Sequence, residues 1–454
     1  MRSTHAASAR SKDQHRRTGL IGAAAALVAA LGSAACGGAG GSAAPDPSFG
    51  QGGLVITTLG GSDDEARALT VLPDGRSVLV GEARPDAGSL RGFAAVRYLA
   101  GGGLDPSFGR GGVVFTAFSE TFGCGANAVA QQPDGKLVVA GFARHPERAH
   151  DGFAVVRYLQ DGSLDQGFGG SGGVITAVDP QSGAGHNDIG RAVAVDARGR
   201  IVVAGETGGA FKDVALVRYL ADGSLDPDFG EGGGVVTDLG GDDRAQALAL
   251  QPDGKILVAG SGGRGSSEDF VLLRYLPDGR LDTSFGQGGH VTTDFRGGSD
   301  RGQGLALRPD GKIVVGGVLQ LSGGCEPRTT CERYGLALAQ YTSAGQLDPG
   351  FGEGGKASLD LISSAGGYGL ARLKDGHLAL AGHVGNEDFA VALLHEDGRP
   401  EASFGDAGVA RVSFGPGTDR ASGVGALPDG GFLVGGSATT ASGSAFALAR
   451  FRPN

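Results

Sequence analysis

The chain has 454 residues, of which 89 are glycine and 18 are proline, and 40% of its residues are hydrophobic. So many turn-forming residues argue against a helical bundle, and the hydrophobic content argues against a disordered chain. The formal net charge of −10 argues against the phosphate backbone of a nucleic acid as the partner.

The first 35 residues have the pattern of a secretory signal peptide. Basic residues precede an apolar run from Leu20 to Leu31, which is shorter than the roughly 20 residues of a membrane-spanning helix. The run ends in GSAAC, residues 32 to 36, which resembles the lipobox of bacterial lipoproteins. This resemblance implies that Cys36 is lipidated and that residues 36 to 44 form a flexible tether. Ser33 stands where that family prefers an aliphatic residue, so ordinary cleavage remains the alternative.

The rest of the chain, residues 45 to 454, repeats one unit with a period of about 60 residues. Three markers each occur seven times: the dipeptide Phe-Gly, a turn of the PDG type, and an Arg-Tyr-Leu motif or its degenerate copies. The phenylalanines of the first marker are Phe49, Phe108, Phe168, Phe229, Phe285, Phe351 and Phe404.

Each unit predicts four short antiparallel strands. The unit that begins at Gln246 contains the apolar segments 247–251, 255–260, 269–276 and 290–295, separated by turns rich in Gly and Asp. The apolar runs are nearly continuous, which indicates sheets that are covered on both faces. We therefore predict an all-β fold, a seven-bladed β-propeller of four-stranded blades.

The two ends of this region predict how the ring closes. The last unit stops after FALARF, residues 446 to 451, and lacks the segment that contains Phe-Gly and the fourth strand. The missing segment is present at the start, in residues 45 to 59. We expect this N-terminal strand to complete the last blade, which removes an open sheet edge. An open solenoid is the alternative, and it would call for terminal caps of different composition.

The repeated motifs resemble the delta-60 repeat family of bacterial proteins, whose units carry LDPSFG, QPDGKIVVAG and FALARY. The resemblance covers residues 45 to 454 and implies export and a repeat architecture rather than a reaction. Unit three departs from the pattern at Asp196–Gly199, and unit six departs from it around His395 and Glu401.

An arginine precedes an aspartate by eight residues in four units, and we interpret these pairs as repeated structural ion pairs rather than as sites. The pairs are Arg97 with Asp105, Arg157 with Asp165, Arg218 with Asp226 and Arg274 with Asp282. Arg450 is expected to meet Asp46 across the closure, and Leu393 faces Glu401 in the unit that lacks the arginine.

Acidic residues recur just before the first strand of several units, and these are the candidate Ca²⁺ ligands if that strand lies nearest the axis. The candidates are Asp64, Asp188, Asp243, Asp300 and Asp419. Basic neighbours recur beside them, so turns that neutralise their own charge are the alternative. We expect no other cofactor.

The cysteines and histidines suggest few further sites. Cys325 and Cys331 lie in an insertion and are expected to form a disulfide in an oxidising compartment, whereas Cys124 is either unpaired or paired with Cys36. His145 with His150, and His377 with His383, are weak candidates for metal binding or general-base catalysis.

The sequence therefore predicts an exported protein, anchored in the cell envelope by lipid only, or secreted if Cys36 is not acylated. We expect a monomer that works as a non-enzymatic binding or scaffolding module for an envelope protein or glycan. The alternative is a hydrolase or lyase acting on polysaccharide at the axial rim, because one propeller fold supports many chemistries. No catalytic residue is assigned.

Overall fold

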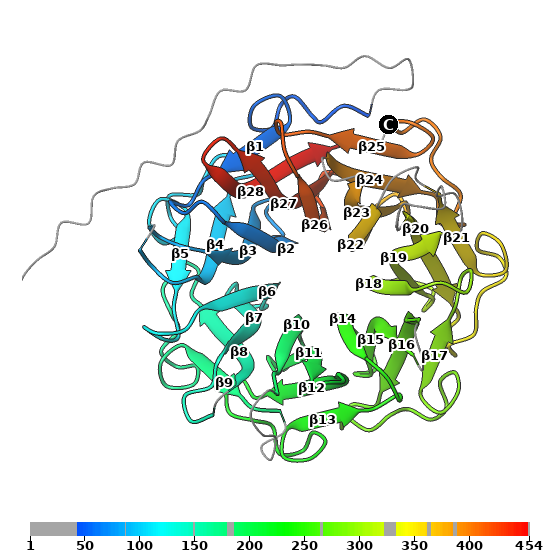
Figure 1. Cartoon of the computed structure of the whole chain (residues 1–454), viewed down its shortest axis with the longest axis horizontal. Coiled ribbons are helices and arrows are strands. Elements are labelled where there is room, and N and C mark those ends of the chain that lie inside the picture. The colour runs from blue at the N-terminus through cyan, green and yellow to red at the C-terminus, as the bar shows by residue number, and fades with distance from the viewer. Residues whose placement is uncertain are drawn as a thin grey trace, which may run out of the picture.

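The computed structural model describes residues 43–86, 88–148, 150–178, 186–263, 267–321, 333–360, 365–384 and 388–452. All of the regular elements in these ranges are strands, and they form seven four-stranded sheets around a central axis (Figure 1). None of the described segments is a helix that could span a bilayer. The predicted all-β propeller with seven blades is confirmed.

The blades are numbered here in chain order, with the innermost strand first. Blade 1 contains β2 (Glu65–Val71), β3 (Ser77–Ala83), β4 (Gly92–Tyr98) and β5 (Val113–Thr116). Blade 2 contains β6 (Cys124–Gln131), β7 (Leu137–Arg144), β8 (Asp151–Tyr158) and β9 (Gly173–Thr176). Blade 3 contains β10 (Ile189–Val195), β11 (Ile201–Thr207), β12 (Asp213–Tyr219) and β13 (Gly234–Thr237). Blade 4 contains β14 (Arg244–Leu250), β15 (Ile256–Gly262), β16 (Asp269–Tyr275) and β17 (His290–Thr293).

The remaining three blades follow the same plan. Blade 5 contains β18 (Asp300–Leu307), β19 (Ile313–Leu321), β20 (Arg333–Tyr341) and β21 (Lys356–Leu359). Blade 6 contains β22 (Ala365–Arg372), β23 (Leu378–Val384), β24 (Asp388–Leu394) and β25 (Val409–Val412). Blade 7 contains β26 (Arg420–Ala426), β27 (Phe432–Thr440), β28 (Gly443–Phe451) and β1 (Leu54–Thr57).

The PDG segment forms the tight turn between the two innermost strands of a blade. In blade 4, Gly254 has a φ of 84°, which an L-residue rarely adopts, and its N–H donates to the carbonyl of Gln251 at 2.9 Å. The side chain of Asp253 accepts from the N–H of Lys255 at 3.2 Å. The local sequence thus determines the turn, and the turn sets the pairing of β14 with β15.

The Phe-Gly phenylalanines pack between neighbouring blades. Phe168 is fully buried and shares one hydrophobic cluster with Val138 and Phe153 of blade 2 and with Ile201 and Val217 of blade 3. All seven phenylalanines are at most 1% exposed. Because an aromatic side chain buries a large apolar area, each one stabilises the contact between two blades.

The predicted arginine–aspartate pairs form, and they are buried. The Nε–Oδ2 distances are 2.8 Å for Arg97 and Asp105, 2.8 Å for Arg157 and Asp165, 2.7 Å for Arg218 and Asp226, and 2.9 Å for Arg274 and Asp282. Each guanidinium also donates to a backbone carbonyl of the next blade, as Arg218 does to Pro277, and it covers the ring of the Phe-Gly phenylalanine. The predicted repeated ion pairs are thus present, and the structure adds that they connect successive blades.

The N-terminal segment forms the outer edge of blade 7. There β1 pairs antiparallel with β28, so the sheet order is β1-β28-β27-β26. The N–H of Asp46 donates to the carbonyl of Arg450 at 2.7 Å, and their side chains form an ion pair at 3.2 Å. Tyr98 of blade 1 donates its hydroxyl hydrogen to Thr57 at 2.9 Å, so the closing strand also contacts the first blade.

Several predictions fall outside the described residues. They are the signal peptide 1–35, the lipidation of Cys36 with most of the tether, and the disulfide between Cys325 and Cys331. Cys124 is described: it is 2% exposed in β6 and is a free thiol, and burial raises its pKa.

Candidate functional site

The innermost strand of every blade contains a β-bulge at the same repeat position. In blade 1, Ala66 pairs with Gly81 and Ala68 with Val80, which leaves Arg67 between them without a partner. A bulge turns one side chain out of the regular alternation. The seven bulge residues are Arg67, Asn127, Arg191, Gln246, Gln303, Tyr368 and Ser422.

A glycine of the second strand makes room for the bulge. A Cβ added to Gly81 would lie 1.9 Å from the carbonyl oxygen of Glu65, and one added to Gly260 would lie 1.8 Å from that of Arg244. This close approach explains why the apolar run of the repeat ends in glycine, since any other residue would push the bulge away.

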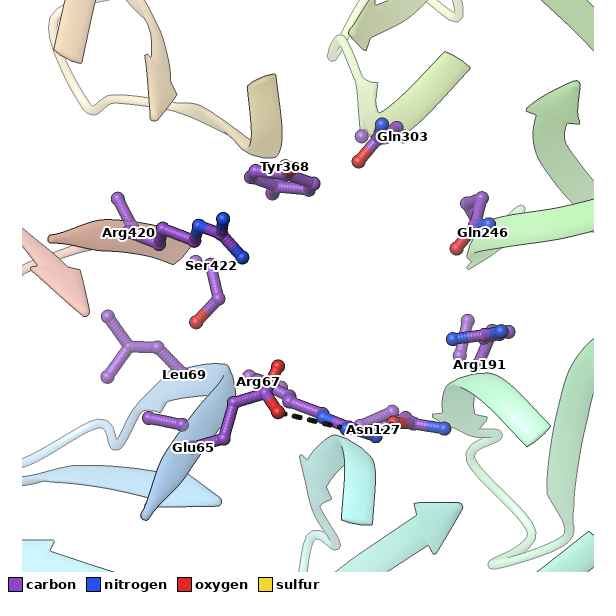
Figure 2. Close-up of a pocket in the computed structure, with 18 of the residues that line it drawn as sticks. Glu65, Arg67, Leu69, Asn127, Arg191, Gln246, Gln303, Tyr368, Arg420 and Ser422 are labelled. Atoms are coloured by element: carbon purple, nitrogen blue, oxygen red, sulfur yellow. Dashed lines mark hydrogen bonds and ion pairs between the residues drawn. The ribbon is translucent and has the colours of Figure 1, made fainter. Parts of the chain in front are cut away.

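The bulge residues surround an axial cavity of about 1050 Å³ (Figure 2). We call them the bulge ring. Charged residues two positions before the bulge line the cavity on the side of the loops that precede the innermost strands. They are Glu65, Arg244, Arg301 and Arg420. Two positions after the bulge, the lining consists of aliphatic side chains: Leu69, Val129, Val193, Leu248, Leu305, Leu370 and Val424. The cavity thus combines a polar ring with an apolar base, which is typical of ligand-binding cavities.

On the side of blades 1 to 3, the ring is bonded internally. Arg67 donates to Asn127 at 2.9 Å and forms ion pairs with Glu65 at 3.1 Å and Glu82 at 3.0 Å. Arg191 pairs with Glu206 at 3.0 Å. Because these guanidinium groups already have partners, this half of the ring is held in place.

On the side of blades 4 to 7, Arg244 and Arg301 form ion pairs with Glu268, whereas three other polar groups that line the cavity have no such partner among the described residues. The amides of Gln246 and Gln303 and the guanidinium of Arg420 make no hydrogen bond to any residue that the structure describes. Tyr368 is 38% exposed, and its ring stacks on His383 with a centroid distance of 5.5 Å and an interplanar angle of 19°. This side of the cavity offers two amides and an aromatic face from the bulge ring, and the guanidinium of Arg420, to a ligand.

Four of the five predicted Ca²⁺ ligands lie outside the described lining of this cavity. Each is fully buried and accepts a hydrogen bond from a backbone N–H of the preceding connection. The bonds are Leu59 to Asp64, Val178 to Asp188, Leu239 to Asp243, Phe295 to Asp300 and Phe414 to Asp419, at 2.7 to 2.9 Å. Asp64 is the member of this set that also lines the described cavity, so the side chains around the axis are mainly basic and amide groups.

Burial raises the pKa of Asp64, Asp300 and Asp419 to about 6, although backbone hydrogen bonds oppose this effect. Clustered acids with raised pKa values would indicate a catalytic site. These three belong to different blade junctions and are fixed by their own backbone, so their raised pKa values follow from burial.

We expect the titration of Asp300 to stabilise the fold as the pH falls. Its folded pKa of about 6 exceeds the ordinary value of 3.8, so the folded state binds its proton first and gains stability between pH 7 and pH 4. Relative to Asp300→Asn, the wild-type free energy of unfolding should rise by about 1 kcal/mol from pH 7 to pH 5. Urea unfolding at both pH values measures this, with Asp310→Asn, a change at an exposed turn, as the control. If the difference in free energy of unfolding between the wild type and Asp300→Asn stayed constant or decreased from pH 7 to pH 5, the raised pKa of Asp300 would be contradicted.

Calcium binding at the five aspartates stays a prediction. Two of them belong to acidic triads whose carboxylate oxygens lie within 4.8 Å of one another. The triads are Asp213, Asp238 and Asp243, and Asp269, Asp294 and Asp300.

The structure regroups the histidine candidates. His145 and His150 share a loop, where the N–H of His145 donates to the carbonyl of His150 at 3.0 Å. His377 and His383 lie at opposite ends of β23, so the predicted pair does not form. The ring of His383 stacks on that of Tyr368. The ring of His377 instead contacts that of His395, with 4.9 Å between the centroids.

Sequence reasoning missed the bulge ring, although the repeated glycine of the second strand was a signal for it. A strand that faces a glycine in every unit is a candidate for a bulge or another close approach of the backbone. Gln246, Gln303 and Tyr368 carry no motif of their own, and only the bulge brings them to one ring.

A family profile described as "Domain of unknown function (DUF5122) beta-propeller" matches residues 72–108, 132–168, 199–229, 251–285 and 427–454. These segments lie in blades 1 to 4 and 7. A comparison with curated proteins finds no match.

Several solved structures resemble the chain. A protein of unknown function from Dyadobacter fermentans is 11% identical, with 88% of this chain and 98% of that chain covered and a TM-score of 0.44. The α-L-arabinofuranosidase Arb93A from Fusarium graminearum is 12% identical, with 72% and 92% covered and a TM-score of 0.42. The Trypanosoma rangeli sialidase is 10% identical, with 87% and 56% covered and a TM-score of 0.42. Likenesses this distant carry no argument about function.

Proposed function

We propose that this seven-bladed β-propeller, five segments of which match a β-propeller family profile, is a non-enzymatic binding module whose ligand enters the axial cavity. The observation that carries the proposal is the bulge ring, because one polar side chain from each of seven blades converges there. A rigid scaffold that presents differing side chains at equivalent positions is a common basis for binding.

We propose that the ligand is a glycan that bears carboxylates. The amides of Gln246 and Gln303 both donate and accept hydrogen bonds, as sugar hydroxyls do. The exposed ring of Tyr368 offers an apolar face to a sugar ring, and the guanidinium of Arg420 suits a carboxylate. Burial raises the pKa of Tyr368, and the nearby charge of Arg420 opposes this shift in part.

The carboxylates that line the cavity support binding over hydrolysis. Arg91 holds Asp63 in an ion pair and lowers its pKa, Asp64 is buried and bonded to the backbone, and Glu65 pairs with Arg67. A general acid or base must reach the substrate within hydrogen-bond distance. Asp63 and Glu65 are held by arginines and Asp64 is fully buried, which makes the polysaccharide-active enzyme the weaker proposal.

We expect oligosaccharides of a uronic acid to bind the purified protein more tightly than neutral oligosaccharides of the same length. Tyr368→Ala and Arg420→Ala should each weaken binding about tenfold, which corresponds to about 1.4 kcal/mol. Isothermal titration calorimetry measures the affinities.

The matched control for this experiment is Arg280→Ala, which removes an arginine whose side chain is 77% exposed outside the cavity. It should leave the affinity unchanged. Equal affinity for neutral and acidic oligosaccharides, or an Arg420→Ala variant that binds as the wild type does, would exclude the proposed recognition.

We propose that this module is a monomer, exported and attached to the cell envelope through an acyl group on Cys36. The support is the sequence of the first 36 residues and the resemblance of the repeats to the delta-60 family. The mass of the mature N-terminal peptide distinguishes an acylated Cys36 from ordinary cleavage at a small-residue site.

A further inference from the structure

In most blades, two cations surround one carboxylate on the side of the PDG turn. In blade 2, Lys136 and Arg157 lie 3.1 Å and 2.8 Å from Oδ2 of Asp165. In blade 4, Lys255 and Arg274 lie 3.4 Å and 2.9 Å from Oδ2 of Asp282. The lysine follows the PDG turn, the arginine lies on the third strand, and the aspartate precedes the Phe-Gly dipeptide.

Blade 6 replaces all three of these residues. His377 takes the place of the lysine, Leu393 that of the arginine and Glu401 that of the aspartate, as the shared register of the strands shows. The N–H of Glu401 donates to the carbonyl of Leu393 at 2.8 Å, just as Asp282 donates to Arg274 at 2.9 Å. A second histidine, His395, follows the third strand. The two permanent cations have thus been exchanged for two imidazoles around the same carboxylate position.

The three side chains have the spacing of metal ligands. Oε2 of Glu401 lies 3.5 Å from Nε2 of His377 and 3.1 Å from Nε2 of His395, and one ligand atom of each residue lies within 4.8 Å of the others. Bonds of about 2.0–2.2 Å to a tetrahedral zinc ion place neighbouring ligand atoms about 3.3 Å apart. The two carboxylate-to-imidazole distances bracket this value.

The surroundings orient two of these ligands. Oε1 of Glu401 accepts from the N–H and hydroxyl of Ser403 at 3.0 Å and 2.6 Å, which turns Oε2 toward the histidines. Both ring nitrogens of His377 are buried and make no hydrogen bond to the described residues. Nδ1 of His377 lies 3.0 Å from Oδ2 of Asp375, although not in line for a hydrogen bond. A carboxylate beside the far ring nitrogen is the usual support of a histidine that binds metal.

We propose that His377, His395 and Glu401 bind one transition-metal ion, with Zn²⁺ as the expected occupant. Two imidazoles and a carboxylate suit zinc and its neighbours better than Ca²⁺, which prefers oxygen ligands. The side chains are 21%, 44% and 22% exposed, so water can complete the coordination. The ion would connect the turn before β23, the end of β24 and the segment before β25, in place of the arginine ion pair of blades 1 to 4.

The test is a Zn²⁺ titration of the purified, EDTA-treated full-length protein in competition with a chromogenic chelator. We expect one Zn²⁺ to bind per chain, and this binding should require His395. The unfolding midpoint should rise by about 2–4 °C with saturating Zn²⁺ but not with Ca²⁺. His395→Ala and Glu401→Gln should abolish both effects. The control His290→Ala changes a histidine of β17 and should retain them.

A second variant tests whether the metal replaces the ion pair. The triple change His377→Lys, Leu393→Arg and Glu401→Asp restores the residues of blade 4, so it should bind no Zn²⁺ at this position and unfold at one temperature with or without the metal. Zn²⁺ binding that survives His395→Ala undiminished would overturn the proposal. A midpoint of the triple variant that still rises with Zn²⁺ would also overturn it.

Discussion

A chain that begins at Gly60 is expected to lose its cooperative unfolding transition and its monomeric state. This truncation removes β1, the side chain of Phe49, which is 1% exposed, and the ion pair between Asp46 and Arg450. Loss of one buried phenylalanine costs about 3–5 kcal/mol, and a domain is stable by only about 5–15 kcal/mol. The truncation also exposes β28 as an unpaired edge, which favours aggregation. Urea unfolding and size-exclusion chromatography measure both effects.

Two controls distinguish the loss of the closing strand from the loss of chain length alone. A chain that begins at Pro45 keeps the closing strand and should unfold as the full-length protein does. A circular permutant that carries residues 45 to 59 behind Asn454 should also fold, because the two segments to be joined already lie side by side. Nε of Arg452 is 2.6 Å from Oδ2 of Asp46. If the chain that begins at Gly60 were as stable as the one that begins at Pro45, the closing strand would contribute nothing.

We expect Arg218→Met to lower the free energy of unfolding by about 3–5 kcal/mol. Both Arg218 and Asp226 are 3% exposed, so the substitution leaves a buried carboxylate with less compensation. It also removes the hydrogen bond to the carbonyl of Pro277 in the next blade and the contact with Phe229. Equilibrium unfolding in urea measures the loss.

The double change Arg218→Leu and Asp226→Asn should recover part of this stability, because it removes the uncompensated charge. Leu393 already occupies the arginine position in blade 6, which shows that an apolar side chain fits there. The exposed Arg280→Ala should change stability by less than about 0.5 kcal/mol. If Arg218→Met cost no more than Arg280→Ala, the buried pairs would not hold the blades together.

Fold prediction succeeded because its signals are local and repeated. A PDG turn specifies its own hairpin, and seven copies of three markers specify the number of blades. The pairing of Asp46 with Arg450 followed from the segment that the last repeat lacks. Each of these inferences needed only the order of residues along the chain.

The binding site was less predictable because a single bulge changes which side chains face the axis. In a regular strand, side chains alternate between the two faces, and an inserted residue shifts that alternation by one. The aspartates three positions before the bulge were expected around the axis if the first strand of each unit lay innermost. Instead, Asp300 bonds to the backbone of Phe295, and Gln303 faces the cavity.

The sequence by itself determined the seven blades, the closing strand and the arginine–aspartate pairs, because all of these depend on spacings that recur along the chain. Only the tertiary structure decided that Gln246, Gln303, Tyr368 and Arg420 share one cavity, and that His377 lies with His395 and Glu401 rather than with His383. The physical reason is that residues from separate strands and turns converge through sheet register and blade packing, and neither is encoded in any one segment.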